Sequence, residues 1–121
     1  MPSFQGISMA RDYAQFPDDE NGDVLWDMSQ RDDLSKPREV DFSVIFPSEE
    51  AALKFAIHLL RSDQKVSFSA YEGNKELPWQ VQAHAFMVPT HENITGYEEQ
   101  LAREAEPLGG RNDGWGCFAQ E

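Results

Sequence analysis

Along most of the chain the apolar side chains switch between the two-residue period of a strand and the longer period of a helix. This order constrains the fold more than any other feature. Residues 40–46 alternate as a strand with one apolar face. A helix follows over residues 48–60, because Ser48 provides an N-cap and Glu49 places negative charge at the start of the helix. The apolar positions of these two elements are Val40, Phe42, Val44, Phe46, Ala52, Phe55, Ala56 and Leu59.

The same pattern of apolar residues predicts the helices and strands of the rest of the chain. It predicts a strand over residues 65–71, a hairpin loop over 72–76, a strand over 79–88, a helix over 90–108 and a strand over 115–120. Thr90 is the expected N-cap of the second helix, and Gly109 and Gly110 end it because glycine tolerates positive φ. Residues 112–114, Asn-Asp-Gly, are expected to form the turn before the last strand.

Residues 40–120 are therefore predicted to form one α+β domain with the element order β-α-β-β-α-β. Two helices with single apolar faces pack on one side of a sheet, which gives a two-layer sandwich. Right-handed crossovers then produce an antiparallel sheet of strand order 4-1-3-2, the ferredoxin-like arrangement. Residues 1–39 are expected to be an acidic N-terminal segment with a short helix over 23–30.

The charge balance restricts the class of partner. The chain has 22 acidic and 10 basic residues, which gives a formal net charge of -12. Such a charge repels nucleic acid and anionic membranes, because binding to either depends on Lys and Arg. It favours a basic protein partner through electrostatic steering. The alternative is that the charge serves solubility alone.

No pattern in the sequence predicts a metal, a cofactor or a catalytic residue. The three histidines show no metal-ligand spacing with Cys117, the single cysteine. Residues 18–23 are acidic, but as a calcium loop they would place Pro17 and Met28 at ligand positions. The glycine-rich residues 109–116 lead from a helix into a strand, the reverse of a phosphate-binding loop. We therefore expect no enzyme activity.

The starting residues have neither the charge nor the apolar run of a secretion signal, and no segment is apolar for long enough to span a membrane. A single cysteine also excludes an intramolecular disulfide. These features together predict a cytoplasmic protein.

The two helices are expected to leave one face of the sheet open. An amphipathic row on the long third strand is typical of a binding surface. The last strand adds to that face either Trp115 with Cys117, or Phe118. The alternative is that the N-terminal segment covers the open face. The predicted partner-binding residues are Tyr71, Gln80, Gln82, His84, Phe86 and Trp115.

Four segments of the chain resemble one known family, the regulator of ribonuclease E activity B domain. They are residues 36–42, 46–52, 87–91 and 109–118, and the most specific piece is the Asp-Gly-Trp-Gly run at 113–116. The resemblance implies a ferredoxin-like fold without enzyme activity, in a bacterial inhibitor that binds ribonuclease E and so alters RNA decay. Longer members carry an acidic C-terminal tail, whereas the acidic cluster here lies between Asp18 and Asp33.

Two other functions fit the same fold. One is a homodimeric or small-ligand-binding module that uses the open face or the last edge strand. The other is an enzyme without a recognisable motif, since one fold supports many functions.

Overall fold

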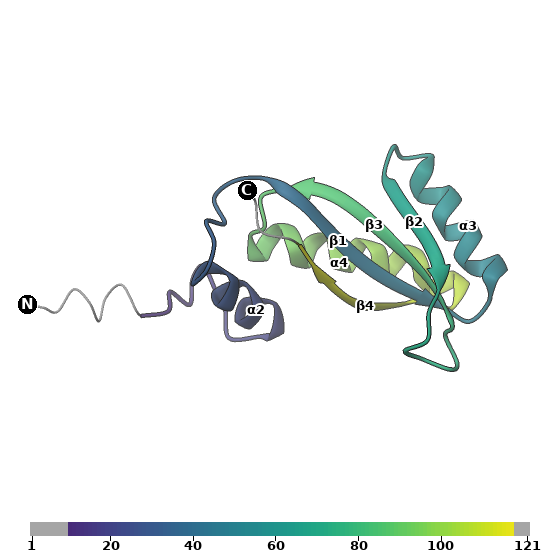
Figure 1. The fold of residues 1–121 in the computed structure, drawn as a ribbon, viewed down its shortest axis with the longest axis horizontal. Coiled ribbons are helices and arrows are strands. Elements are labelled where there is room, and N and C mark those ends of the chain that lie inside the picture. Colours follow the sequence, from purple (N-terminus) through teal and green to yellow (C-terminus); the bar gives the residue numbers. More distant parts are fainter. Residues whose placement is uncertain (1–9, 118–121) are drawn as a thin grey trace, which may run out of the picture.

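The structure, a computed structural model, describes residues 10–117 (Figure 1). Its elements in chain order are α2 (Glu20–Ser29), β1 (Arg38–Phe46), α3 (Glu49–Leu60), β2 (Lys65–Ala70), β3 (Trp79–Met87), α4 (His91–Ala105), the 3-10 helix η1 (Glu106–Leu108) and β4 (Arg111–Gly116). None of the helices within residues 10–117 is long and apolar enough to span a membrane.

The four strands form one antiparallel sheet in the order β2-β3-β1-β4. This is the predicted order read from the other edge, so the α+β class and the sheet topology are confirmed. Phe42 on the inner strand β1 lies opposite Ala83 of β3 and Trp115 of β4. The edge strand β2 pairs only with β3 and is mostly exposed.

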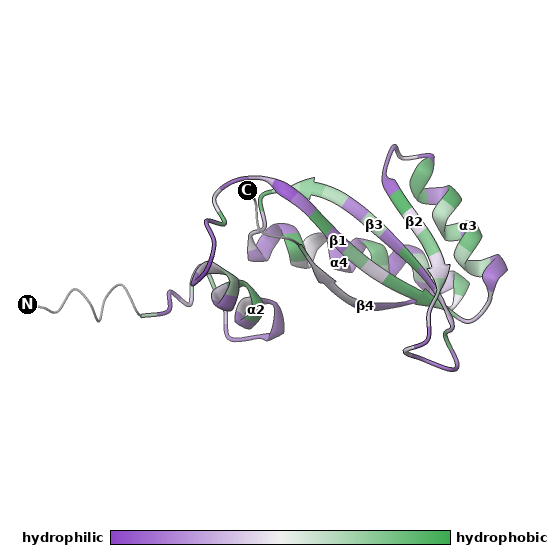
Figure 2. Ribbon diagram, viewed as in Figure 1, coloured by the Kyte–Doolittle hydropathy of each residue, from purple (hydrophilic) through white to green (hydrophobic). Residues whose placement is uncertain are grey.

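The core lies between one face of the sheet and the helices α3 and α4. Figure 1 shows α4 passing behind the strands, and Figure 2 shows hydrophobic residues concentrated on β1 and α3 while the loops are hydrophilic. The predicted caps are confirmed, because Ser48 accepts a hydrogen bond from the Ala51 N–H and Thr90 from the Asn93 N–H. The buried cluster contains Val40, Phe42, Val44, Phe46, Ala52, Phe55, Ala56, Leu59, Val81, Ala83, Ile94, Leu101 and Ala105.

The described part of the N-terminal segment extends the helical layer. The helix α2 begins at Glu20, three residues earlier than predicted, because Asp19 accepts a hydrogen bond from the Gly22 N–H and caps it. A Cβ atom on Gly22 would lie 1.7 Å from the carbonyl oxygen of Pro17, so only glycine fits there. Figure 1 shows α2 beyond the end of the sheet and not across its strands. The alternative of a covered face is therefore not observed for residues 10–37. The domain boundary at residue 39 stays a prediction.

The last strand differs from the prediction. It spans Arg111–Gly116, not 115–120, and the predicted positions 118–120 lie outside the described residues. Asn112 is already paired with Val44, and Trp115 is paired with Phe42. One residue separates the partners on β1 but two separate them on β4, which makes a β-bulge. Gly114 at φ 99° permits it. The residues read as a turn are therefore a bulge inside the strand.

Candidate functional site

Within residues 10–117, one face of the sheet is free of helices, and its inner strands carry a row of polar and aromatic side chains. Val81 and Ala83 of β3 face the core, so the alternate residues of this strand face outward. Phe86 is 73 % exposed, which is unusual for a phenylalanine. We call this surface the open face, and its described members on β1, β2 and β3 are Glu39, Asp41, Ser43, Ile45, Lys65, Ser67, Ser69, Gln80, Gln82, His84 and Phe86.

A chain of hydrogen bonds crosses the middle of the open face. Asp41 of β1 lies directly opposite His84 of β3, and its Oδ1 is 2.6 Å from the His84 Nδ1. On the other side of the ring, the Ser67 Oγ of β2 is 2.9 Å from the His84 Nε2. The imidazole is therefore fixed at both nitrogens, and its side chain is only 13 % exposed.

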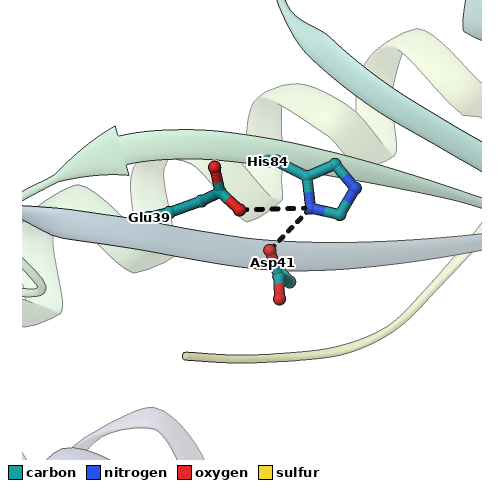
Figure 3. Close-up of side chains that lie close together, drawn as sticks. All are labelled: Glu39, Asp41 and His84. Atoms are coloured by element: carbon teal, nitrogen blue, oxygen red, sulfur yellow. Dashed lines mark hydrogen bonds and ion pairs between the residues drawn. The ribbon is translucent and has the colours of Figure 1, made fainter. Parts of the chain in front are cut away.

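A second carboxylate approaches the same ring. The Glu39 Oε2 is 4.0 Å from the His84 Nδ1, and the Glu39 Oε1 accepts a hydrogen bond from the Lys65 Nζ at 2.9 Å. This bond holds the pKa of Glu39 below its usual value. Figure 3 shows His84 reaching from β3 toward Glu39 and Asp41 on β1. One ligand atom from each of the three lies within 4.8 Å of those of the others.

The order of atoms from Ser67 through His84 to Asp41 is that of a hydrolase triad. A hydrolase triad also needs donors aimed at the developing oxyanion and a pocket that positions the substrate. Ser67 is instead exposed on the edge strand β2. The hydrogen bonds therefore orient the ring of His84 on an open surface and do not enclose a substrate.

A hollow of about 400 Å³ lies next to this chain, between β1 and β4. Its polar lining includes Asp41, Asp113 and Gln82, and the Gln82 side-chain amide donates to the Ser43 Oγ at 3.1 Å. The bulge in β4 forms one wall, because Gly114 also lines the hollow. Two carboxylates beside an amide suit a cationic side chain.

Tyr71 fixes the loop between β2 and β3 at one end of the open face. Interaction of its phenol with the Asp113 carboxylate of β4 raises the pKa of Tyr71. Because β2 and β4 are opposite edges of the sheet, the loop reaches across the face here. Ile45 points toward the same side of the sheet, but it is only 1 % exposed. This end of the face is therefore covered, whereas the sequence predicts that it is open.

Trp115 lies on the helix side of the sheet. It shares a face with its partner Phe42, packs against the core together with Cys117, and donates its indole N–H to the Asn21 Oδ1 at 2.9 Å. The bulge thus turns these two side chains toward the core, although both residues also line the hollow beside Asp41. The other predicted candidate, Phe118, is outside the described residues.

The other predicted site residues lie on or beside the open face. Gln80, Gln82, His84 and Phe86 follow one another on β3, and Tyr71 is in the adjoining loop. The prediction missed Glu39, Asp41 and Ser67, which contact or approach His84. Glu39 and Asp41 are two residues apart on one strand, which the sequence shows, but the pairing of β1 and β2 with β3 depends on the register.

Comparison with protein families gives a match. A family model described as "Regulator of ribonuclease activity B" matches residues 18–117. This range includes every helix and strand of the described residues. No curated protein matches the chain.

Proposed function

The chain belongs to the family of regulators of ribonuclease activity B, and from this membership we propose that it regulates a ribonuclease by binding the enzyme. The match is the observation that carries the proposal, since it spans residues 18–117 of a 121-residue chain. In this proposal the chain has no enzyme activity of its own. Its arrangement is of the ferredoxin-like type, which the element order and the sheet order support.

The open face is the proposed contact surface. Phe86 supports this assignment, because a largely exposed phenylalanine beside polar groups is typical of the centre of a protein interface. The fixed ring of His84 and the amides of Gln80 and Gln82 supply hydrogen-bonding groups around it. Tyr71 borders the surface. Trp115 holds β4 from the helix side, and it also lines the hollow beside β4.

Charge supports a basic partner, and we propose ribonuclease E. The formal net charge of -12 favours encounter with a positively charged protein and disfavours direct contact with RNA or with membranes. The hollow lined by Asp41 and Asp113 provides a place for an arginine or lysine of the enzyme. A bound regulator then covers positive surface that RNA needs, so RNA decay slows. The proposed location is the bacterial cytoplasm.

Titration calorimetry of the purified chain with ribonuclease E tests the proposal. We expect saturable binding that weakens as salt increases, because steering by charge is screened. Phe86→Ala should weaken binding about tenfold or more. Ile57→Ala is the matched control, since this apolar side chain is 48 % exposed on α3, away from the open face. Both variants should keep the melting temperature of the unchanged chain.

Two results would contradict the proposal. One is the absence of binding to ribonuclease E at low salt. The other is an equal loss of affinity in the Phe86 and Ile57 variants, which would place the contact elsewhere. Light scattering of the free chain addresses the alternative of a homodimer. A stable dimer that Phe86→Ala dissociates would assign the open face to self-association.

A further inference from the structure

We propose that Glu39, Asp41 and His84 form a binding site for a divalent transition-metal ion of the zinc class. Two carboxylates and one imidazole come within 4.8 Å of one another on the open face. This combination of oxygen and nitrogen ligands suits zinc, whereas magnesium and calcium prefer oxygen ligands alone. The proposal does not depend on a ribonuclease partner.

The pairing of β1 with β3 fixes the position of all three ligands. Glu39 and Asp41 are two residues apart on β1 and so project from the same face, and Asp41 is directly opposite His84. Both strands are inner strands of the sheet, so each is held by neighbours on two sides. Three ligands on a rigid support need little reorganisation when an ion binds.

The distances between ligand atoms are close to what a zinc ion requires. Zinc bonds to oxygen and nitrogen of about 2.0–2.1 Å in a tetrahedral site separate two ligand atoms by about 3.3 Å. The His84 Nδ1 is 2.6 Å from the Asp41 Oδ1 and 4.0 Å from the Glu39 Oε2. These two values lie on either side of the required separation. An ion would take the place of the hydrogen bond between the His84 Nδ1 and Asp41, and the single proton of the neutral ring would then be on Nε2.

The neighbours of the site orient its ligands. Histidines that bind metals usually donate their second ring N–H to a nearby acceptor. The Ser67 Oγ, 2.9 Å from the His84 Nε2, is such an acceptor, and it leaves the Nδ1 lone pair toward the carboxylates. Lys65 opposes metal binding, because its ammonium pairs with Glu39 and competes with a bound cation. Because Glu39 is exposed, the site is open to solvent.

Calorimetric titration of the full chain with zinc chloride tests the site. We expect one ion per chain and a change in the ring signals of His84 by NMR, with no competition from an equal concentration of magnesium. His84→Gln should abolish binding, and Glu39→Gln should weaken it by more than about tenfold without harm to the fold, as Glu39 is exposed. Ser67→Ala should weaken it by about tenfold.

Two other histidines provide matched controls. His58 contacts Glu104 and His91 contacts Asp19, so within residues 10–117 each forms an ion pair with one carboxylate. His58→Gln and His91→Gln should therefore leave the zinc affinity unchanged. Lys65→Met should increase the affinity severalfold, because it removes the competing charge. Unchanged zinc binding in Glu39→Gln or His84→Gln, or a loss of binding in either control, would overturn the proposal.

Discussion

The indole N–H of Trp115 donates to the Asn21 Oδ1 at 2.9 Å, across 94 positions of the sequence. The side-chain nitrogen of Asn21 donates in turn to the Thr95 Oγ1 at 3.0 Å and to the Glu98 Oε1 at 2.8 Å. One amide of α2 is thus bonded to both α4 and β4. This group joins the N-terminal segment to the sheet through polar contacts.

The bond between these two residues should be measurable by itself. Trp115→Phe keeps an aromatic ring but removes the N–H, so the free energy of unfolding should fall by about 1 kcal/mol. In an Asn21→Ala background the same change should cost much less, because the acceptor is already absent. Urea denaturation of the four proteins provides the test. Equal costs in both backgrounds would show that the hydrogen bond does not stabilise the fold.

Arg38 and Asp32 should respond unequally to replacement. The Arg38 side chain is 1 % exposed, whereas that of Asp32 is 19 % exposed. Asp32→Ala leaves a buried guanidinium without its carboxylate and should cost about 3 kcal/mol of unfolding free energy. Arg38→Met replaces the buried charge with an apolar chain and leaves only a more accessible carboxylate. Arg38→Met should lower the free energy of unfolding by clearly less than Asp32→Ala does. Denaturant unfolding in which Arg38→Met is the less stable variant would contradict this.

The bulge in β4 should depend on glycine at position 114. Gly114 has a φ of 99°, so Gly114→Ala should destabilise the chain by about 1–3 kcal/mol. Gly96 is the control, because it lies within α4 and a Cβ atom there would meet nothing within 4 Å. Gly96→Ala should raise stability by about 0.4–1 kcal/mol. Thermal unfolding compares the two variants. If both lose stability, the positive φ of Gly114 is not the cause of the loss in Gly114→Ala.

Acid should weaken the start of α2. The Gly22 N–H, and next the His91 side chain, hold the pKa of Asp19 below its usual value. A carboxyl group with a lowered folded-state pKa stabilises the fold above its unfolded pKa of about 3.9 and loses this effect as the pH falls through the folded value. Asp19→Asn should therefore be less stable than the unchanged chain at pH 6, and this difference should shrink as the pH falls toward 2.

Urea unfolding between pH 2 and pH 6 measures this difference. The stability of His91→Gln should depend on pH more than that of Asp19→Asn. The hydrogen bond from the Gly22 N–H, which is the larger cause of the lowered Asp19 pKa, remains in His91→Gln. Identical pH profiles for the unchanged chain and Asp19→Asn would contradict the role given to this carboxylate.

The sequence was sufficient to predict the layers and the order of the strands. The period of the apolar residues identifies β1 and α3, and the caps at Ser48 and Thr90 mark where the helices begin. β4 was placed wrongly because Asn112-Asp113-Gly114 has the composition of a turn. The same residues also suit a bulge, and only the pairing with β1 distinguishes the two.

The sequence predicts only part of the candidate site, because the pairing between strands cannot be read from one strand alone. The row on β3 follows from alternation within one strand, so His84 and Phe86 were found. Asp41 and Ser67 come from neighbouring strands, and their contacts with His84 depend on the register of two pairings. The side of the sheet on which Trp115 lies could not be predicted, because the extra residue of the bulge reverses the alternation.

The edge strand β2 affects how the molecules behave at high concentration. The edge strand β2 is only six residues long and carries the cation of Lys65 together with the hydroxyls of Ser67 and Ser69. Short, polar, charged edges resist the strand-to-strand stacking that produces fibrils. The β2 edge should therefore resist pairing between molecules at high concentration, while the neighbouring surface on β1 and β3 is still free to meet a partner.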